Sequence, residues 1–144
     1  MTLTLDKENA GTKMEMNIDF PGGKRVRSTY KGLSVETDQP KNEGGTGTAP
    51  APFDLFLASI GTCAGFYVIS FCDSRNIATD HIRITLRFDR NEKSHLMERI
   101  DIDINLPDDF PDKYRKAVIR AAEKCTVKRN LKYPPIIQVN EIRS

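Results

Sequence analysis

The sequence predicts an α+β fold in which antiparallel strands flank a long buried helix. Segments of alternating apolar and polar residues, the pattern of half-buried strands, occur on both sides of a long uncharged segment. Strands and helices do not alternate strictly, and short turns join several strands, so antiparallel hairpins are favoured over a parallel α/β sheet. The length of 144 residues suits one domain, which we expect to span residues 1–144.

The composition argues against several classes of protein. A net charge of +2, with 38% hydrophobic and 29% charged residues, is ordinary for a soluble globular chain and unlike a disordered chain or a general polyanion binder. Three cysteines without a CxxC motif argue against a secreted disulfide scaffold and against a zinc ribbon. The first residues lack the apolar stretch of a signal peptide, so we expect a cytoplasmic protein with reduced thiols.

Strand patterns dominate the first third of the chain. Alternation over residues 14–20 predicts a strand, the Pro-Gly-Gly run at 21–23 predicts a turn, and residues 25–30 complete a hairpin. A further strand is predicted over residues 33–37. The segment 39–52 is rich in Gly, Pro, Thr and Asn, and it predicts an ordered but irregular loop.

A long helix is predicted over residues 52–72, and Pro52 suits its first turn. The 18 residues 55–72 carry no charge and are apolar nearly all round, so we expect most faces of this helix to be buried. This segment is at the short end for a membrane span and contains Ser, Thr and Gly. The core helix of a soluble protein is therefore favoured over a membrane helix.

The clearest alternation lies in two segments that follow this helix. Residues 82–89 and 100–106 each alternate apolar with polar side chains, and the polar loop 90–95 joins them. The polar face of the earlier segment is mostly basic and that of the later one is acidic. We expect the two strands to pair antiparallel, because opposite charges on facing strands stabilise such pairs.

The last third predicts one helix and one short strand. The helix is expected over residues 113–126 with Asp112 as its N-cap, and the strand over residues 136–142. The stretch 112–132 holds eight Lys or Arg residues and two acids. A solvated helix face explains this charge, and no motif of base-stacking aromatics accompanies it, so nucleic-acid binding is not expected.

The cysteines are the candidate reactive residues. Cys63 lies inside the long helix, in the run GTCAG, whose small residues would let another element or a ligand approach the thiol. Cys125 lies at the end of the second predicted helix. Cys72 follows Cys63 by nine residues and points about 180° away on a straight helix, so it is assigned to the core. His81 and His95 lie at no short ligand spacing from a cysteine, and no metal site is expected.

Two segments together resemble a known family. GGTGTAPAPFDLFLASIGTCAGFYVISFCDSRNI resembles the central cysteine helix of the OsmC/Ohr-like proteins and its Gly-rich approach, and AAEKCTVKRNL resembles their second cysteine helix. The resemblance implies an OsmC-like α+β fold, with antiparallel sheets wrapped around two cysteine-bearing helices in an intertwined homodimer. It also implies active sites at the subunit interface.

The resemblance further implies a thiol peroxidase that reduces organic hydroperoxides in oxidative-stress defence. Cys63 would be the peroxidatic thiolate and Cys125 the resolving thiol, with an external dithiol as reductant and without a cofactor. The chemistry is coherent, because a thiolate oxidised to sulfenic acid condenses with a second thiol to a disulfide that a dithiol can reduce.

A peroxidatic thiolate needs a lowered pKa, which an adjacent cation commonly provides. Gly22-Gly23-Lys24-Arg25 resembles the Gly-Gly-Arg segment that carries the Ohr arginine, so Arg25 is the candidate, with Lys24 and Arg27 as alternatives. Phe53 stands where the Ohr branch has a Glu, which favours the broader OsmC-like branch.

The alternative function is a non-enzymatic OsmC-like protein that binds a small apolar or thiol-reactive ligand at the dimer interface. The absence of the Ohr Glu motivates this alternative. Four aromatic residues either line an apolar pocket for the ligand or form plain core; they are Phe53, Phe56, Phe66 and Tyr67.

Overall fold

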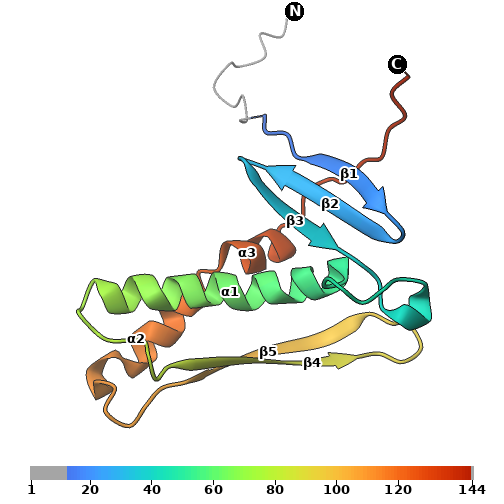
Figure 1. The fold of residues 1–144 in the computed structure, drawn as a ribbon. Coiled ribbons are helices and arrows are strands. Elements are labelled where there is room, and N and C mark those ends of the chain that lie inside the picture. The colour runs from blue at the N-terminus through green and yellow to red at the C-terminus, as the bar shows by residue number, and fades with distance from the viewer. Residues whose placement is uncertain (1–12, 144) are drawn as a thin grey trace, which may run out of the picture. The chain divides into compact units, whose positions relative to one another are not determined.

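The computed structural model describes residues 13–143 and divides into two compact units, Met1–Asp54 and Leu55–Ser144. Figure 1 shows their elements along the chain. Antiparallel strands and helices are both present, so the predicted α+β class is confirmed. That all 144 residues form one domain stays a prediction.

The first unit holds a three-stranded antiparallel sheet in the order β1-β2-β3. Its strands are β1 (Asn17–Gly22), β2 (Arg25–Tyr30) and β3 (Leu33–Thr37). The β1–β2 turn requires glycine, because Gly22 and Gly23 have φ of 133° and 60°. All three predicted strands are confirmed, although the first begins three residues later than the alternation suggested.

The loop after β3 is ordered around one buried carboxylate. It contains the short helix η2 (Lys41–Glu43). Asp38 is 1% exposed and accepts hydrogen bonds from the backbone N–H groups of Gln39, Thr46 and Thr48 and from both threonine hydroxyls. These bonds, with the Thr46 hydroxyl first, hold the pKa of Asp38 well below its usual range. The predicted ordered, irregular loop is therefore confirmed.

The second unit packs helices on one face of a two-stranded sheet. The helix α1 (Pro52–Asp73) leads into it, and β4 (Arg83–Arg90) pairs antiparallel with β5 (Met97–Asn105). Facing pairs such as Ile84 with Ile104 place apolar side chains together. The two predicted strands and their antiparallel pairing are thereby confirmed.

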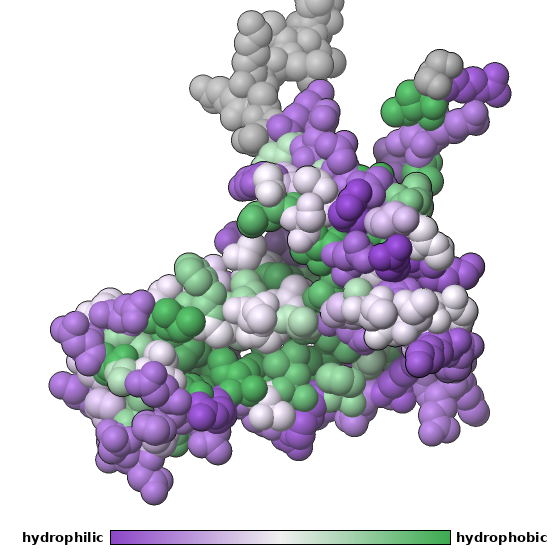
Figure 2. Space-filling model, in the orientation of Figure 1, coloured by the Kyte–Doolittle hydropathy of each residue, from purple (hydrophilic) through white to green (hydrophobic). Residues whose placement is uncertain are grey.

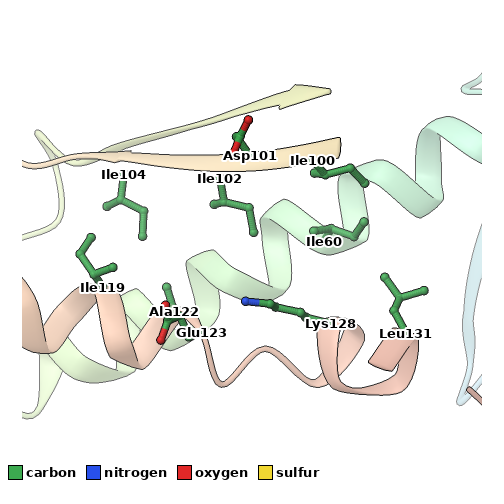
Figure 3. Close-up of a pocket in the computed structure, with 10 residues that line it drawn as sticks. All are labelled: Ile60, Ile100, Asp101, Ile102, Ile104, Ile119, Ala122, Glu123, Lys128 and Leu131. Carbon is green, nitrogen blue, oxygen red and sulfur yellow. The ribbon is translucent and has the colours of Figure 1, made fainter. Parts of the chain in front are cut away.

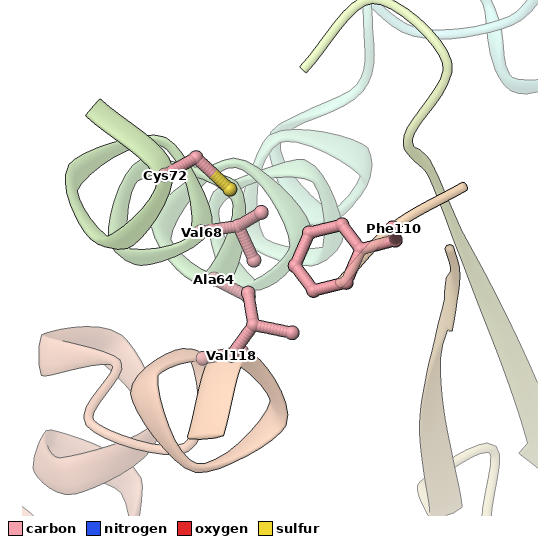
Figure 4. Close-up of a cluster of buried hydrophobic side chains, with 6 residues drawn as sticks. Ala64, Val68, Cys72, Phe110 and Val118 are labelled. Atoms are coloured by element: carbon pink, nitrogen blue, oxygen red, sulfur yellow. The ribbon is translucent and has the colours of Figure 1, made fainter. Parts of the chain in front are cut away.

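The core of this unit forms where α1 meets α2 (Asp112–Ala122), as Figure 4 shows. Its fully buried cluster consists of Ala64, Val68, Cys72, Phe110, Val118 and Ala122. Apolar side chains of both strands pack against this cluster. Burying one Val or Phe side chain stabilises a fold by roughly 1.5–3 kcal/mol, so this cluster is the main stabilising feature of the unit.

The buried residues of α1 form one stripe along the helix and do not cover most of its faces. The buried positions recur at helical spacing; they are Leu57, Ile60, Ala64, Val68 and Cys72. Phe66 and Ile69 are instead 61% and 48% exposed. The expectation of burial on most faces is therefore wrong for the single chain. Figure 2 shows further apolar side chains gathered between α1 and β4.

By length and composition alone, α1 is long and apolar enough to cross a membrane, the one such helix in the described part of the chain. Core helices of soluble proteins pass the same test. The buried stripe packs against α2 and the β4–β5 sheet, which is the arrangement of a core helix.

The last third departs from the sequence prediction in two places. Instead of one helix over 113–126, α2 ends at Ala122 and a separate helix, α3 (Thr126–Lys132), follows. Pro111, rather than Asp112, is the N-cap of α2. The expected strand over 136–142 is absent from the described chain, because a segment forms a strand only where a sheet edge accepts its hydrogen bonds.

Candidate functional site

The site is built where α1 passes the start of α3. Cys63 lies in the middle of α1 and is partly exposed, whereas Cys125 is fully buried and is the N-cap of α3. The structure therefore brings together the two cysteines that the sequence predicted as a pair. Cys125 was expected at the end of the second helix, and that expectation is wrong; the helix break puts its thiol at the start of α3.

The surroundings of Cys63 favour its thiolate. Burial raises the pKa of the Cys63 thiol, but hydrogen bonds from the Val127 backbone N–H, the Cys125 thiol and the Thr126 backbone N–H outweigh it. The pKa of Cys63 therefore lies below its ordinary value. The donors that lower it are neutral groups at the start of α3, and of these only Cys125 was expected from the sequence.

The surroundings of Cys125 favour its protonated form. Burial and the neighbouring Cys63 raise the pKa of the Cys125 thiol above its ordinary value, against the backbone N–H of Lys128. The thiol contacts the Ile60 carbonyl at 4.0 Å, and its sulfur accepts from the Lys128 N–H at 3.4 Å. One sulfur is thus poised as a nucleophile and the other as a proton-bearing thiol.

Two further contacts fix α1 at this site. The Tyr67 hydroxyl, four residues after Cys63, forms a 3.0 Å hydrogen bond with the Thr126 hydroxyl and so ties α1 to α3. On another side of α1, a Cβ on Gly61 would lie 2.7 Å from the Leu86 side chain of β4. The predicted close approach at the small residues around Cys63 is confirmed there.

Arg25, the predicted cation, belongs to the first unit. It lies on β2 and forms an ion pair with Glu36 at 3.4 Å, while Arg27 pairs with Asp19 at 2.9 Å. Arg25 and Lys24 line a glycine-rich hollow of that unit. Because both cysteines belong to the second unit, a role for Arg25 toward Cys63 stays a prediction.

Cys72 is a core residue, as predicted. It is fully buried in the cluster of Figure 4, and burial raises the pKa of its thiol. Among the four aromatic residues singled out in the sequence, Phe66 does not fit the alternative of plain core. Phe66 is largely exposed and makes an edge-to-face contact with Tyr67, with ring centroids 5.5 Å apart.

An apolar pocket of about 270 Å³ adjoins Cys125 through Ile60 (Figure 3). Isoleucines of β5 point into it, whereas Asp101 points away. Ile60, whose carbonyl contacts Cys125, also lines it, and Lys128 extends along it from α3. The pocket was not located by sequence reasoning, because its walls come from four separate elements. Within residues 13–143, no three metal-ligating side chains come together.

The fold and the site define an α+β protein with two thiols of opposite character apposed on adjoining helices. The sequence model of the OsmC-like protein family matches residues 45–140, which is more than half of the chain. The chain therefore belongs to the OsmC-like protein family. A search of curated proteins gives no match.

Solved structures of this family share the fold. An osmotic stress and detoxification response protein of Psychrobacter arcticus matches with a TM-score of 0.70 and 18% identity, covering 84% of this chain and 90% of its own. An OsmC-like protein of Mycoplasma pneumoniae matches at 0.65 and 12%, covering 84% and 88%. An organic hydroperoxide resistance protein of Vibrio cholerae matches at 0.55 and 17%, covering 90% and 92%.

Proposed function

We propose that this chain is a thiol-dependent peroxidase that reduces organic hydroperoxides in oxidative-stress defence. The observation that carries the proposal is the apposition of Cys63, whose pKa is lowered, with Cys125, whose pKa is raised. The family supports it too, because one structural relative is named as an organic hydroperoxide resistance protein.

The reaction balances in three steps. The Cys63 thiolate attacks the outer oxygen of ROOH, the O–O bond breaks, and the alkoxide takes a proton to leave as ROH. The resulting sulfenic acid condenses with the Cys125 thiol, which forms the disulfide and releases water. An external dithiol then reduces the disulfide by exchange and is itself oxidised. No cofactor takes part.

Burial of Cys125 matters for the second step. Its hydrogen bond to Cys63 keeps the resolving thiol next to the sulfur that becomes oxidised. The apolar pocket beside Ile60 offers room for the organic group of the hydroperoxide. Free cysteines at all three positions suit a reducing cytoplasm, where we place the protein.

We also propose that the active form is a homodimer in which Arg25 stabilises the Cys63 thiolate. The support for the dimer is the uncovered side of α1 at Phe66 and Ile69, since exposed apolar patches commonly mark interfaces. A guanidinium near Cys63 would lower the pKa of its thiol further. Arg25→Gln is therefore expected to slow Cys63 alkylation at neutral pH.

The test of the main proposal is the consumption of cumene hydroperoxide with dihydrolipoamide as reductant. The wild type is expected to turn over. Cys63→Ser should abolish turnover, and Cys125→Ser should leave a single oxidation of Cys63 without disulfide formation. Cys72→Ala is the matched control and should keep turnover, because Cys72 lies in the core. Equal consumption by the wild type and Cys63→Ser would overturn the proposal.

The apolar pocket favours a second candidate, a protein that binds a small apolar or thiol-reactive ligand without turnover. This candidate predicts a ligand that co-purifies with the protein and is detected by native mass spectrometry. It also predicts that Cys63 reacts with alkylating reagents no faster than a free thiol. Hydroperoxide turnover by the wild type would remove it.

A further inference from the structure

A second pocket beside the thiol pair is strongly basic. It has a volume of about 710 Å³ and is lined mainly by aromatic and basic residues, which are Tyr67, Lys124, Lys128, Arg129, Lys132 and Tyr133. Glu123 is the one acid in its lining, so four cations and one anion leave a formal charge of +3. These cations make up half of the basic residues in the stretch 112–132.

The four cations lack carboxylate partners within the described part of the chain. Among residues 13–143, none of their charged nitrogens lies within 4.0 Å of an acidic oxygen. The ammonium of Lys132 instead lies over the Tyr133 ring, 5.4 Å from the ring centre. Like charges gathered in one concave surface repel one another and raise the local concentration of anions. This arrangement differs from a solvated helix face with interspersed acids.

The basic pocket adjoins the reactive sulfur through two elements. Tyr67 lines it and lies one helical turn beyond Cys63 on α1. The Tyr67 hydroxyl bonds Thr126, whose backbone N–H also interacts with Cys63. Lys128 lines both this pocket and the apolar pocket of Figure 3.

We propose that the basic pocket binds the carboxylate of a small molecule that reacts at Cys63. The occupant would place its anionic group among Lys124, Lys128 and Arg129 and its reactive atom at the Cys63 sulfur. The identity of that molecule as substrate or reductant rests on the proposed peroxidase function. The presence of an anion site does not depend on that function, and it can be tested without turnover.

The first experiment compares two alkylating reagents that differ mainly in charge. Iodoacetate and iodoacetamide both react with the Cys63 thiolate, forming a carbon–sulfur bond and releasing iodide. The ratio of their rates therefore cancels the thiolate fraction and reports the local preference for an anion. The rates are read on the Cys63 peptide by mass spectrometry, with the urea-unfolded chain as reference. At low salt we expect the ratio to be about fivefold higher in the folded protein.

Three matched double variants, each losing two cations, locate the effect. Lys128→Gln with Arg129→Gln removes cations of the pocket and should return the ratio to that of the unfolded chain. Lys116→Gln with Arg120→Gln removes an exposed pair on α2 outside the pocket and should leave the ratio unchanged. Lys124→Gln with Lys132→Gln should reproduce the first result. The proposal would be overturned if the rate ratio were equal in the wild type and both pocket variants. It would also be overturned if the ratio fell equally in all three double variants.

Two further arms separate the sources of the carboxylate. The oxidation arm compares cumene hydroperoxide with its para-carboxylate, and the reduction arm compares dihydrolipoamide with dihydrolipoate. A preference for the charged member that the pocket variants abolish identifies the step that uses the pocket. If the wild type consumes neither hydroperoxide, the peroxidase proposal fails, while the alkylation ratio still decides the anion site.

A polyanion is the competing occupant. Duplex RNA at about 50 mM salt should leave the iodoacetamide rate of Cys63 unchanged, because the pocket is proposed for a small anion. Protection of Cys63 by RNA in the wild type but not in the Lys128→Gln, Arg129→Gln variant would overturn the proposal in favour of a nucleic-acid surface.

Discussion

The Cys125 side chain acts on Cys63 through its proton. Cys125→Ala removes one of the donors that lower the pKa of Cys63, so the pH midpoint of Cys63 alkylation should rise. Cys125→Ser is the matched variant, because its hydroxyl can still donate, and its midpoint should stay nearer that of the wild type. The midpoint is measured from iodoacetamide rates on the Cys63 peptide. Identical midpoints in Cys125→Ala and the wild type would contradict this role.

Asp38 makes stability depend on acid pH. Its folded-state pKa lies below its unfolded value, so its stabilisation is present above about pH 4 and is lost as the pH falls from there toward the folded pKa. Asp38→Asn should lower the thermal midpoint at pH 7 and flatten its decline below pH 4. Thermal unfolding by circular dichroism at several pH values checks this. An unchanged acid slope in the variant would contradict it.

The roles of single residues were only partly predictable. Cys63, Cys125 and Cys72 received their assignments from the family resemblance and helical geometry, and the structure places the first two together. The backbone N–H groups of Thr126 and Val127 could not be predicted as donors to Cys63, because nothing in the composition marks where one helix ends and the next begins. Asp38 was missed because its partners lie eight to ten residues further on in an irregular loop.

At the scale of elements, α1 meets β4 at two glycines that differ in their surroundings. A Cβ on Gly61 would lie 2.7 Å from Leu86, whereas one on Gly65 would lie 3.7 Å from Ile84. Gly65→Ala should raise the free energy of unfolding by up to about 1 kcal/mol through helix propensity. Gly61→Ala should raise it by less than Gly65→Ala, because its Cβ must first displace the end of the Leu86 side chain.

Urea unfolding of the two variants measures this difference. The slope of the transition should not change, which shows that the unfolded states are comparable. If Gly61→Ala were as stabilising as Gly65→Ala, the close approach of α1 and β4 would be disproved.

Helices and strands were predicted correctly where the local hydrophobic pattern of the sequence agrees with the way that the segment packs in the fold. The β4–β5 pair and α1 follow directly from alternation and from an uncharged segment. The helix expected over 113–126 breaks at residues 123–125, where the Cys125 sulfur accepts from Lys128 N–H. Residues 136–142 are rich in β-branched Ile and Val, as strands are, but a strand also needs a partner edge, which is a tertiary property that local sequence does not encode.

At the scale of the whole molecule, the proposed dimer can be tested by the uncovered side of α1. Phe66→Asp with Ile69→Asp should convert a dimer into a monomer, since burying two charges on an apolar interface is costly. Leu96→Asp is the control; Leu96 is 68% exposed in the β4–β5 loop and should leave the dimer intact. Sedimentation velocity distinguishes the species, and a monomeric wild type would contradict the proposal.

The position of Cys125 at the start of α3 has a consequence for the timing of structural change. Its sulfur accepts the Lys128 N–H in the reduced protein, and a disulfide to Cys63 would rotate that sulfur away. The first turn of α3 should then fray whenever the pair is oxidised, and re-form on reduction. Faster amide hydrogen exchange at Lys128 in the disulfide form would make this helix a built-in reporter of the redox state.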